Sequence, residues 1–172
     1  MSELRDLAKA KIDAERTKLT ASLSADIEAL KRANAAKGLL RSGNTILGVV
    51  GICGSTMQSL GNAILSHYRW AVSQSLIGTQ SWVEALITDS RGQLQPFFER
   101  CVDHVTREAN AAGAPNTIPE CVAKLEAMRE EISTDIALGL RACFAELKRS
   151  RLRSLGSIIT GWISKLFGSA KP

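Results

Sequence analysis

Residues 42–68 have the sequence SGNTILGVVGICGSTMQSLGNAILSHY, which is the longest part of the chain without a Lys, Arg, Asp or Glu. Glycines stand at positions 43, 48, 51, 54 and 61. Each glycine costs a helix about 0.5–1 kcal/mol relative to alanine, so a helix here needs packing to offset them. Gly51, Ser55, Ser59 and Ala63 lie four residues apart and form a strip that lets another helix backbone approach closely. We therefore predict a helix over about 44–77 that is buried on several sides.

The same stretch leaves a second interpretation open. Its length exceeds the roughly 20 residues that a helix needs to span a bilayer. However, Asn, Thr, Ser and Gln residues make it only mildly hydrophobic, and its most apolar part, Ile46 to Gly54, is short. We favour the central helix of a bundle over insertion into a membrane.

Helical patterns flank this segment on both sides. Apolar residues from Leu4 to Leu30 recur at three-, four- and seven-residue steps among charged residues, which predicts a long helix over about 2–37. Its narrow apolar stripe is typical of a coiled coil, and Gly38 suits the position after its end. A capping box at Ser81 and Glu84 predicts a helix over about 81–112, kinked or broken near Pro96. A second capping box, at Thr117 and Glu120, opens a helix to about 153.

No segment alternates apolar and polar residues with the period of a β-strand. The fold class that follows is all-α. We expect an elongated helical bundle of four to five helices, with a long coiled-coil-like N-terminal helix and an amphipathic C-terminal helix. Residues 1–147 would form the bundle and residues 148–172 a basic tail.

The tail is the first candidate contact surface. A basic cluster precedes it, formed by Lys148, Arg149, Arg151 and Arg153, and residues 148–172 contain no acidic residue. One apolar face follows at three- and one-residue steps, formed by Leu155, Ile158, Ile159, Trp162, Ile163, Leu166 and Phe167. This face can fold back on its own bundle, insert into a partner or a second copy, or lie in an anionic membrane interface. The sequence leaves these three possibilities open.

Residues for catalysis, cofactors or metals are not indicated. The run from Gly48 to Thr56 lacks the lysine of a phosphate-binding loop. His67 has no His or Glu at the spacing that places two metal ligands on one helix face, and His104 has only Glu108 at that spacing, too few ligands to indicate a metal site. The four cysteines, Cys53, Cys101, Cys121 and Cys143, form no C-x-x-C pair and stand beside apolar residues, so we expect buried free thiols. We expect no enzyme, no cofactor, no metal and no small-molecule substrate.

The leading functional hypothesis is a non-enzymatic helical protein–protein interaction module that self-associates or binds a larger protein. The alternative is a membrane-active or membrane-docked protein that uses residues 42–68 and the tail. Nucleic-acid binding through Lys148–Arg153 ranks third, because the basic residues form one short run without interleaved aromatic residues. An N-terminus without an apolar signal region favours the cytoplasm, with the membrane periphery as the location that fits the alternative.

Overall fold

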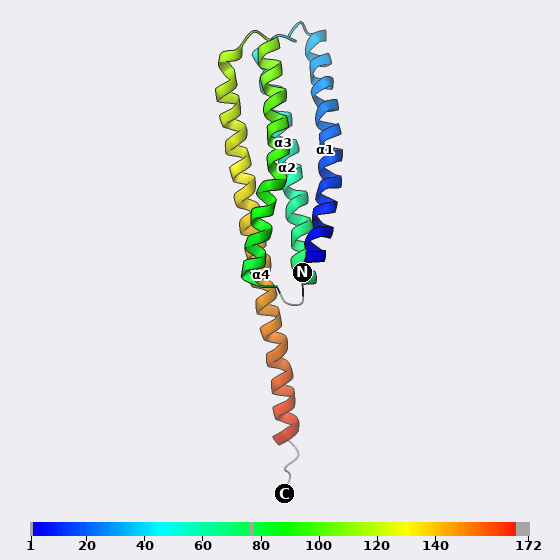
Figure 1. Cartoon of the computed structure of the whole chain (residues 1–172), viewed down its shortest axis with the longest axis vertical. Helices are drawn as coiled ribbons and strands as arrows, with labels where there is room; N and C mark the ends of the chain where they lie inside the picture. Colours follow the sequence, from blue (N-terminus) through cyan, green and yellow to red (C-terminus); the bar gives the residue numbers. More distant parts are fainter. Residues whose placement is uncertain (1, 76–77, 168–172) are drawn as a thin grey trace.

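The computed structural model describes all residues except 1, 76–77 and 168–172, and the side chains of residues up to 151. The described residues form four α-helices, one short 3-10 helix and no strand. The α-helices are α1 (Ser2–Ala36), α2 (Gly43–Gln74), α3 (Gln80–Ala111) and α4 (Ile118–Phe167), and the 3-10 helix is η1 (Pro115–Thr117). Successive helices run in opposite directions along one long axis (Figure 1). The all-α bundle predicted from the sequence is confirmed.

The breaks between helices lie close to the predicted positions. Gly38 adopts φ 72°, in the left-handed region that favours glycine, and its N–H donates to the Ala35 carbonyl at 3.0 Å. The start of α3 differs from the prediction, because Thr79 rather than Ser81 is the N-cap. The Thr79 hydroxyl accepts from the Trp82 N–H at 3.3 Å. The predicted end of the second helix, at 77, lies outside the described residues.

α3 continues through Pro96 as one helix, so of the two predicted alternatives the break is excluded and the kink stays a prediction. The boundary predicted near 153 is wrong. α4 does not end near 153, and the basic tail is not a separate element, because one helix runs from Ile118 to Phe167. Nothing between 148 and 154 is a proline or a glycine, so no residue in that stretch interrupts the helix.

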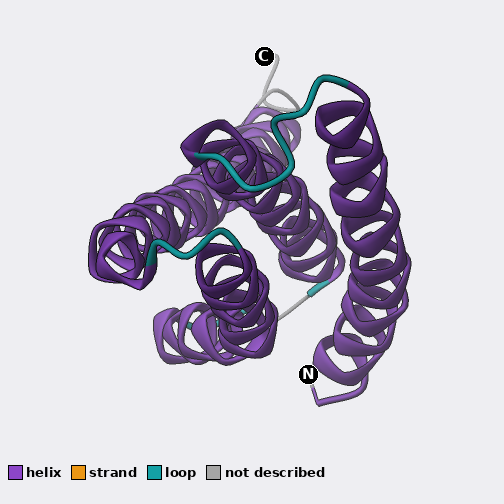
Figure 2. Ribbon diagram, turned by 90° about the horizontal axis from the view of Figure 1, so that it is seen from above, coloured by secondary structure: helices purple, strands orange, loops and turns teal. Residues whose placement is uncertain are grey.

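The bundle is built around α2. This helix contacts α1, α3 and α4, and α3 also contacts α4, whereas α1 and α4 do not contact each other within the described residues. In the end-on view α2 lies between α1 and α4 (Figure 2). Helices α2, α3 and α4 therefore pack against one another, and α1 packs against α2 and, less extensively, α3, adding four buried residues to the same core. The central position predicted for residues 42–68 is confirmed: Ile46, Val49, Cys53, Met57, Leu60, Ile64 and Tyr68 are all buried.

Glycines bring α2 and α4 close together. A Cβ on Gly54 would lie 2.6 Å from Met128 Sδ, and a Cβ on Gly61 would overlap Ile132 Cγ2. The contact is reciprocal, because a Cβ on Gly139 of α4 would lie 2.8 Å from Leu65 Cδ1 of α2. Each glycine thus leaves the space that a larger side chain of the other helix fills. On the other side of α2, Gly48 does the same for Leu30 of α1, at 2.7 Å.

The strip proposed for close packing is wrong within this chain. Gly51, Ser55 and Ser59 are exposed, and a Cβ on Gly51 would meet nothing within 4 Å. Ala63 is half-buried and does not share their face. The reason is helical geometry: four-residue steps advance about 40° beyond a full turn, so the strip rotates by about 120° from Gly51 to Ala63. As predicted, packing offsets the free-energy cost of glycines in α2, but it does so at positions 48, 54 and 61.

Two glycine substitutions test this packing. We expect Gly61→Ala to destabilise the fold by about 1–3 kcal/mol, because the methyl group meets Ile132, which is β-branched and buried. Gly51→Ala is the matched control and should stabilise the fold by about 0.5–1 kcal/mol, because alanine is the better helix former and the site is open. Urea unfolding of both variants measures the difference. A stabilising Gly61→Ala would contradict the packing described here.

Candidate interaction surface

One face of α2 is open along the bundle. Contacts on either side of this face are with different helices, since Gly48 meets α1 while Gly54 and Gly61 meet α4. The face between them carries exposed residues at helical spacing, which are Leu47, Gly51, Ser55, Gln58, Asn62, Ser66 and Arg69. We call this the open face of α2. It exists because α1 and α4 do not meet across it.

The open face combines small side chains with an exposed leucine. Leu47 of α2 is 55% exposed. Gly51 lowers helix stability there without any compensating contact inside the chain. Small residues allow a second helix to approach closely, and the exposed leucine offers it apolar area to bury. The surface therefore has the composition of a helix-docking site.

A pocket lies at one end of the open face. It has a volume of about 270 Å³ and lies between the first turns of α2 and α4. Ile46, Leu47 and Cys121 supply its apolar lining, and Glu120 and Lys124 its charges. Those two charged side chains form an ion pair at 2.9 Å, so neither presents an uncompensated charge to the pocket. The pocket suits an apolar side chain better than an ion.

Charged contacts with α3 supplement the apolar packing of α1 on α2. Arg5 donates two hydrogen bonds to Asp89, at 2.5 and 2.8 Å, and Lys9 lies 3.0 Å from the same carboxylate. Further along the helix, Lys31 pairs with Glu108 at 3.0 Å. Burial opposes the charge on Asp89, but the hydrogen bonds from Arg5 and Lys9 outweigh it and lower the pKa of this carboxyl. These contacts hold the helix that borders one side of the open face.

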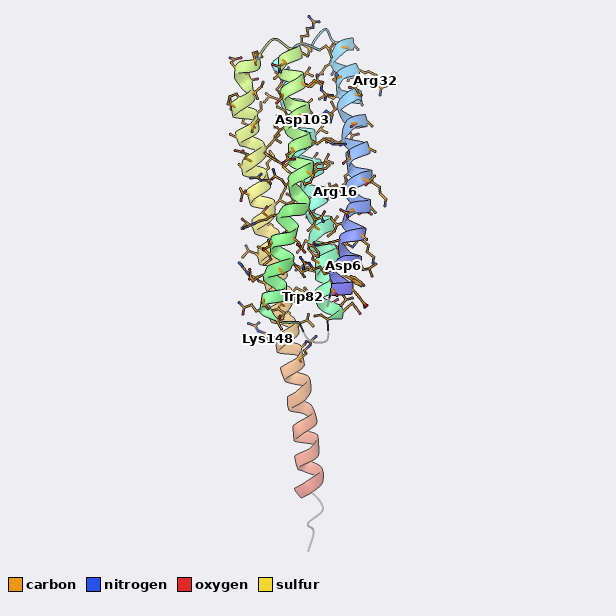
Figure 3. All side chains as sticks on the ribbon, in the orientation of Figure 1. Asp6, Arg16, Arg32, Trp82, Asp103 and Lys148 are labelled. Atoms are coloured by element: carbon orange, nitrogen blue, oxygen red, sulfur yellow. The ribbon has the colours of Figure 1, made fainter. Side chains whose placement is uncertain are left out.

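The second candidate surface is the part of α4 beyond the bundle. Arg151 donates to the carbonyl oxygen of Ser75, in the segment that joins α2 to α3. Lys148 and Arg149 are exposed just before it, and Lys148 lies at the end of the bundle from which α4 projects (Figure 3). The structure keeps the backbone of Arg153, Leu155, Ile158, Ile159, Trp162, Ile163, Leu166 and Phe167 in one helix. Their side chains lie outside the described residues.

The nucleophilic and metal-binding residue types are dispersed or buried. The Cys53 thiol lies 3.9 Å from the Cys101 carbonyl oxygen, and both cysteines are fully buried. The hydrogen bond with Cys53, together with burial, raises the pKa of the Cys101 thiol, which disfavours the reactive thiolate. Burial, with the charges of Arg107 and Arg100, lowers the pKa of His104. Among the described residues, no three His, Cys, Asp or Glu side chains are grouped to hold a metal ion.

Comparison of the chain with protein-family models, with curated proteins and with solved structures finds no significant match. Within the described part of the chain, no helix is both long enough and apolar enough to cross a membrane.

The charged contact between α1 and α3 predicts a pH-dependent effect of Asp89→Asn. The fold lowers the pKa of Asp89, so the ionised carboxylate contributes to the free energy of unfolding. This contribution is fully present above the ordinary carboxyl pKa of about 3.9 and is lost as the pH falls through the lower pKa of the folded state. We expect Asp89→Asn to lower the free energy of unfolding by about 1 kcal/mol at pH 7. Urea unfolding of both proteins, repeated at decreasing pH, should show this difference shrinking in acid. A difference independent of pH would mean that the charge of Asp89 does not hold α1.

Proposed function

We propose that this protein is a non-enzymatic helical protein–protein interaction module that uses the open face of α2 to bind a helix. The helix comes from a second copy of the chain or from a larger protein. The observation that carries the proposal is the separation of α1 and α4, which leaves one side of the central helix exposed along the bundle. A partner helix would complete the packing around α2.

Three features of the open face support this proposal. Gly51 and Ser55 permit close approach of a helix backbone, while Leu47 provides exposed apolar area. The pocket beside Leu47 offers a place for one apolar side chain of the partner. No charged residue of α2 stands on the face between Leu47 and Ser66, so a helix docked on that part of α2 covers no charged side chain of α2. The coiled-coil character expected of α1 stays a prediction within this proposal.

The third hypothesis, nucleic-acid binding, has less support. Its basic cluster spans Lys148 to Arg153 and forms one short run without the interleaved aromatic residues that stack on bases. The absence of enzymatic activity and the cytoplasmic location both stay predictions.

Substitution of Ser55 tests the proposal. Ser55 is exposed, so Ser55→Leu should leave the unfolding of the monomer unchanged. In the associated state the larger side chain overpacks the contact, which typically costs about 1–3 kcal/mol and would raise the dissociation constant roughly 5- to 150-fold. Sedimentation velocity over a range of concentrations measures this change for self-association.

Ser24→Leu provides the matched control. Ser24 is an exposed serine on α1. Its hydroxyl donates to the Thr20 carbonyl of its own helix, as the hydroxyl of Ser55 donates to the Ile52 carbonyl on α2. This variant should associate like the wild type. If the wild type is monomeric at every concentration, affinity capture from host extract replaces sedimentation, and Ser55→Leu must lose a partner that Ser24→Leu retains. Equal behaviour of the two variants in both assays would rule out the open face as a binding surface.

A further inference from the structure

The last part of α4 leaves the bundle. Arg151, through Ser75, makes the last described side-chain contact with the rest of the chain. Residues 152–167, which we call the α4 arm, continue the helix in the same direction with no other helix beside them (Figure 1). At 1.5 Å per residue the arm is about 24 Å long. The possibility that this segment folds back over its own bundle is therefore not the arrangement in the structure.

The sequence of the arm has a wide apolar face. Seven apolar residues of the arm, from Leu155 to Phe167, follow the spacing of one helix face. At 3.6 residues per turn they cover roughly half of the helix circumference. The other half consists mostly of Gly156, Ser157, Thr160, Gly161 and Ser164. A groove between two helices takes a narrower stripe, whereas a flat apolar layer takes a face this wide.

Charge identifies the kind of surface that complements the arm. Residues 148–172 contain six basic residues and no acidic residue, and Lys148 and Arg149 are exposed where the arm begins. Two such arms side by side would repel each other, which disfavours their pairing between copies of the chain. A negatively charged surface would attract the same residues. Trp162 and Phe167 suit the headgroup region of a bilayer, where aromatic side chains are enriched.

We propose that the α4 arm docks this protein on an anionic membrane surface. The apolar half of the arm lies among the headgroups and upper acyl chains, and the basic residues at its start contact anionic lipid. Membrane docking and the binding of a helix on α2 use different residues, so each can be tested with its own variant. A protein anchored in this way would present the open face of α2 to partners at the membrane.

Vesicle flotation with the full chain tests this proposal. We expect the protein to float with vesicles of phosphatidylcholine and phosphatidylglycerol, to stay unbound with phosphatidylcholine alone, and to be released by added salt. Trp162→Asp places a charge in the apolar face and should abolish flotation. Leu40→Asp is the matched control: it changes an exposed leucine in the segment between α1 and α2, and should float like the wild type.

A charge-removal variant keeps the test valid if Trp162→Asp does not fold. Lys148→Gln combined with Arg149→Gln changes two exposed side chains and should lower the affinity for anionic vesicles about 30-fold. Ser55→Leu should float normally, which separates this proposal from helix binding on α2. The proposal fails if the wild type does not float, or if Trp162→Asp or the charge-removal variant floats like the wild type. It also fails if Trp162→Asp changes the sedimentation of the lipid-free protein while no variant binds vesicles, because the arm would then contact protein.

Discussion

The close contact between α2 and α4 determines the arrangement of the other helices. Gly54 and Gly61 of α2 receive Met128 and Ile132, and Gly139 of α4 receives Leu65. Without side chains at these three positions, the two helices pack closer than ordinary residues would permit. In an up-and-down bundle of four helices, α2 and α4 would usually be diagonal neighbours. Here they pack directly, and α3 packs against both.

The arrangement of α1 follows from that contact. With α4 drawn onto α2, α1 contacts α2 and α3 but does not reach α4. Only Ala8, Ile12, Leu23 and Ile27 of α1 are buried, so its apolar seam is narrow. The ion pairs of Arg5 and Lys9 with Asp89, and of Lys31 with Glu108, supplement this seam. The same arrangement leaves the open face of α2 uncovered, and the proposed helix-binding function depends on that exposure. The α4 arm is a separate feature at the end of the bundle.

Sequence reasoning could predict the elements of this fold better than their contacts. Helix breaks depend on local signals, and Gly38 and the uncharged central stretch of α2 were interpreted correctly from such signals. Which face of α2 meets a neighbour depends on partners that the local sequence does not specify. The strip of Gly51, Ser55 and Ser59 was therefore placed in a contact, whereas Gly54 and Gly61 make it. In α4, Gly139 interrupts the run of apolar seam residues. This glycine was the signal in the sequence that α4 packs closely against another helix. In the arm, the amphipathic pattern was readable. Its continuity with α4 was readable too, because residues 148–154 contain no proline or glycine and a basic cluster does not end a helix.

A double-mutant cycle between Gly61 and Ile132 tests the α2–α4 contact most directly. Ile132→Ala alone should destabilise the fold by about 2–5 kcal/mol, because it leaves a cavity opposite Gly61. In that background the methyl group of Gly61→Ala enters the vacated space, so the second substitution should no longer destabilise the fold. The account predicts a coupling free energy of about 1–3 kcal/mol from urea unfolding of the four proteins. Effects that add to within about 0.5 kcal/mol would show that Gly61 and Ile132 do not pack against each other, and would contradict it.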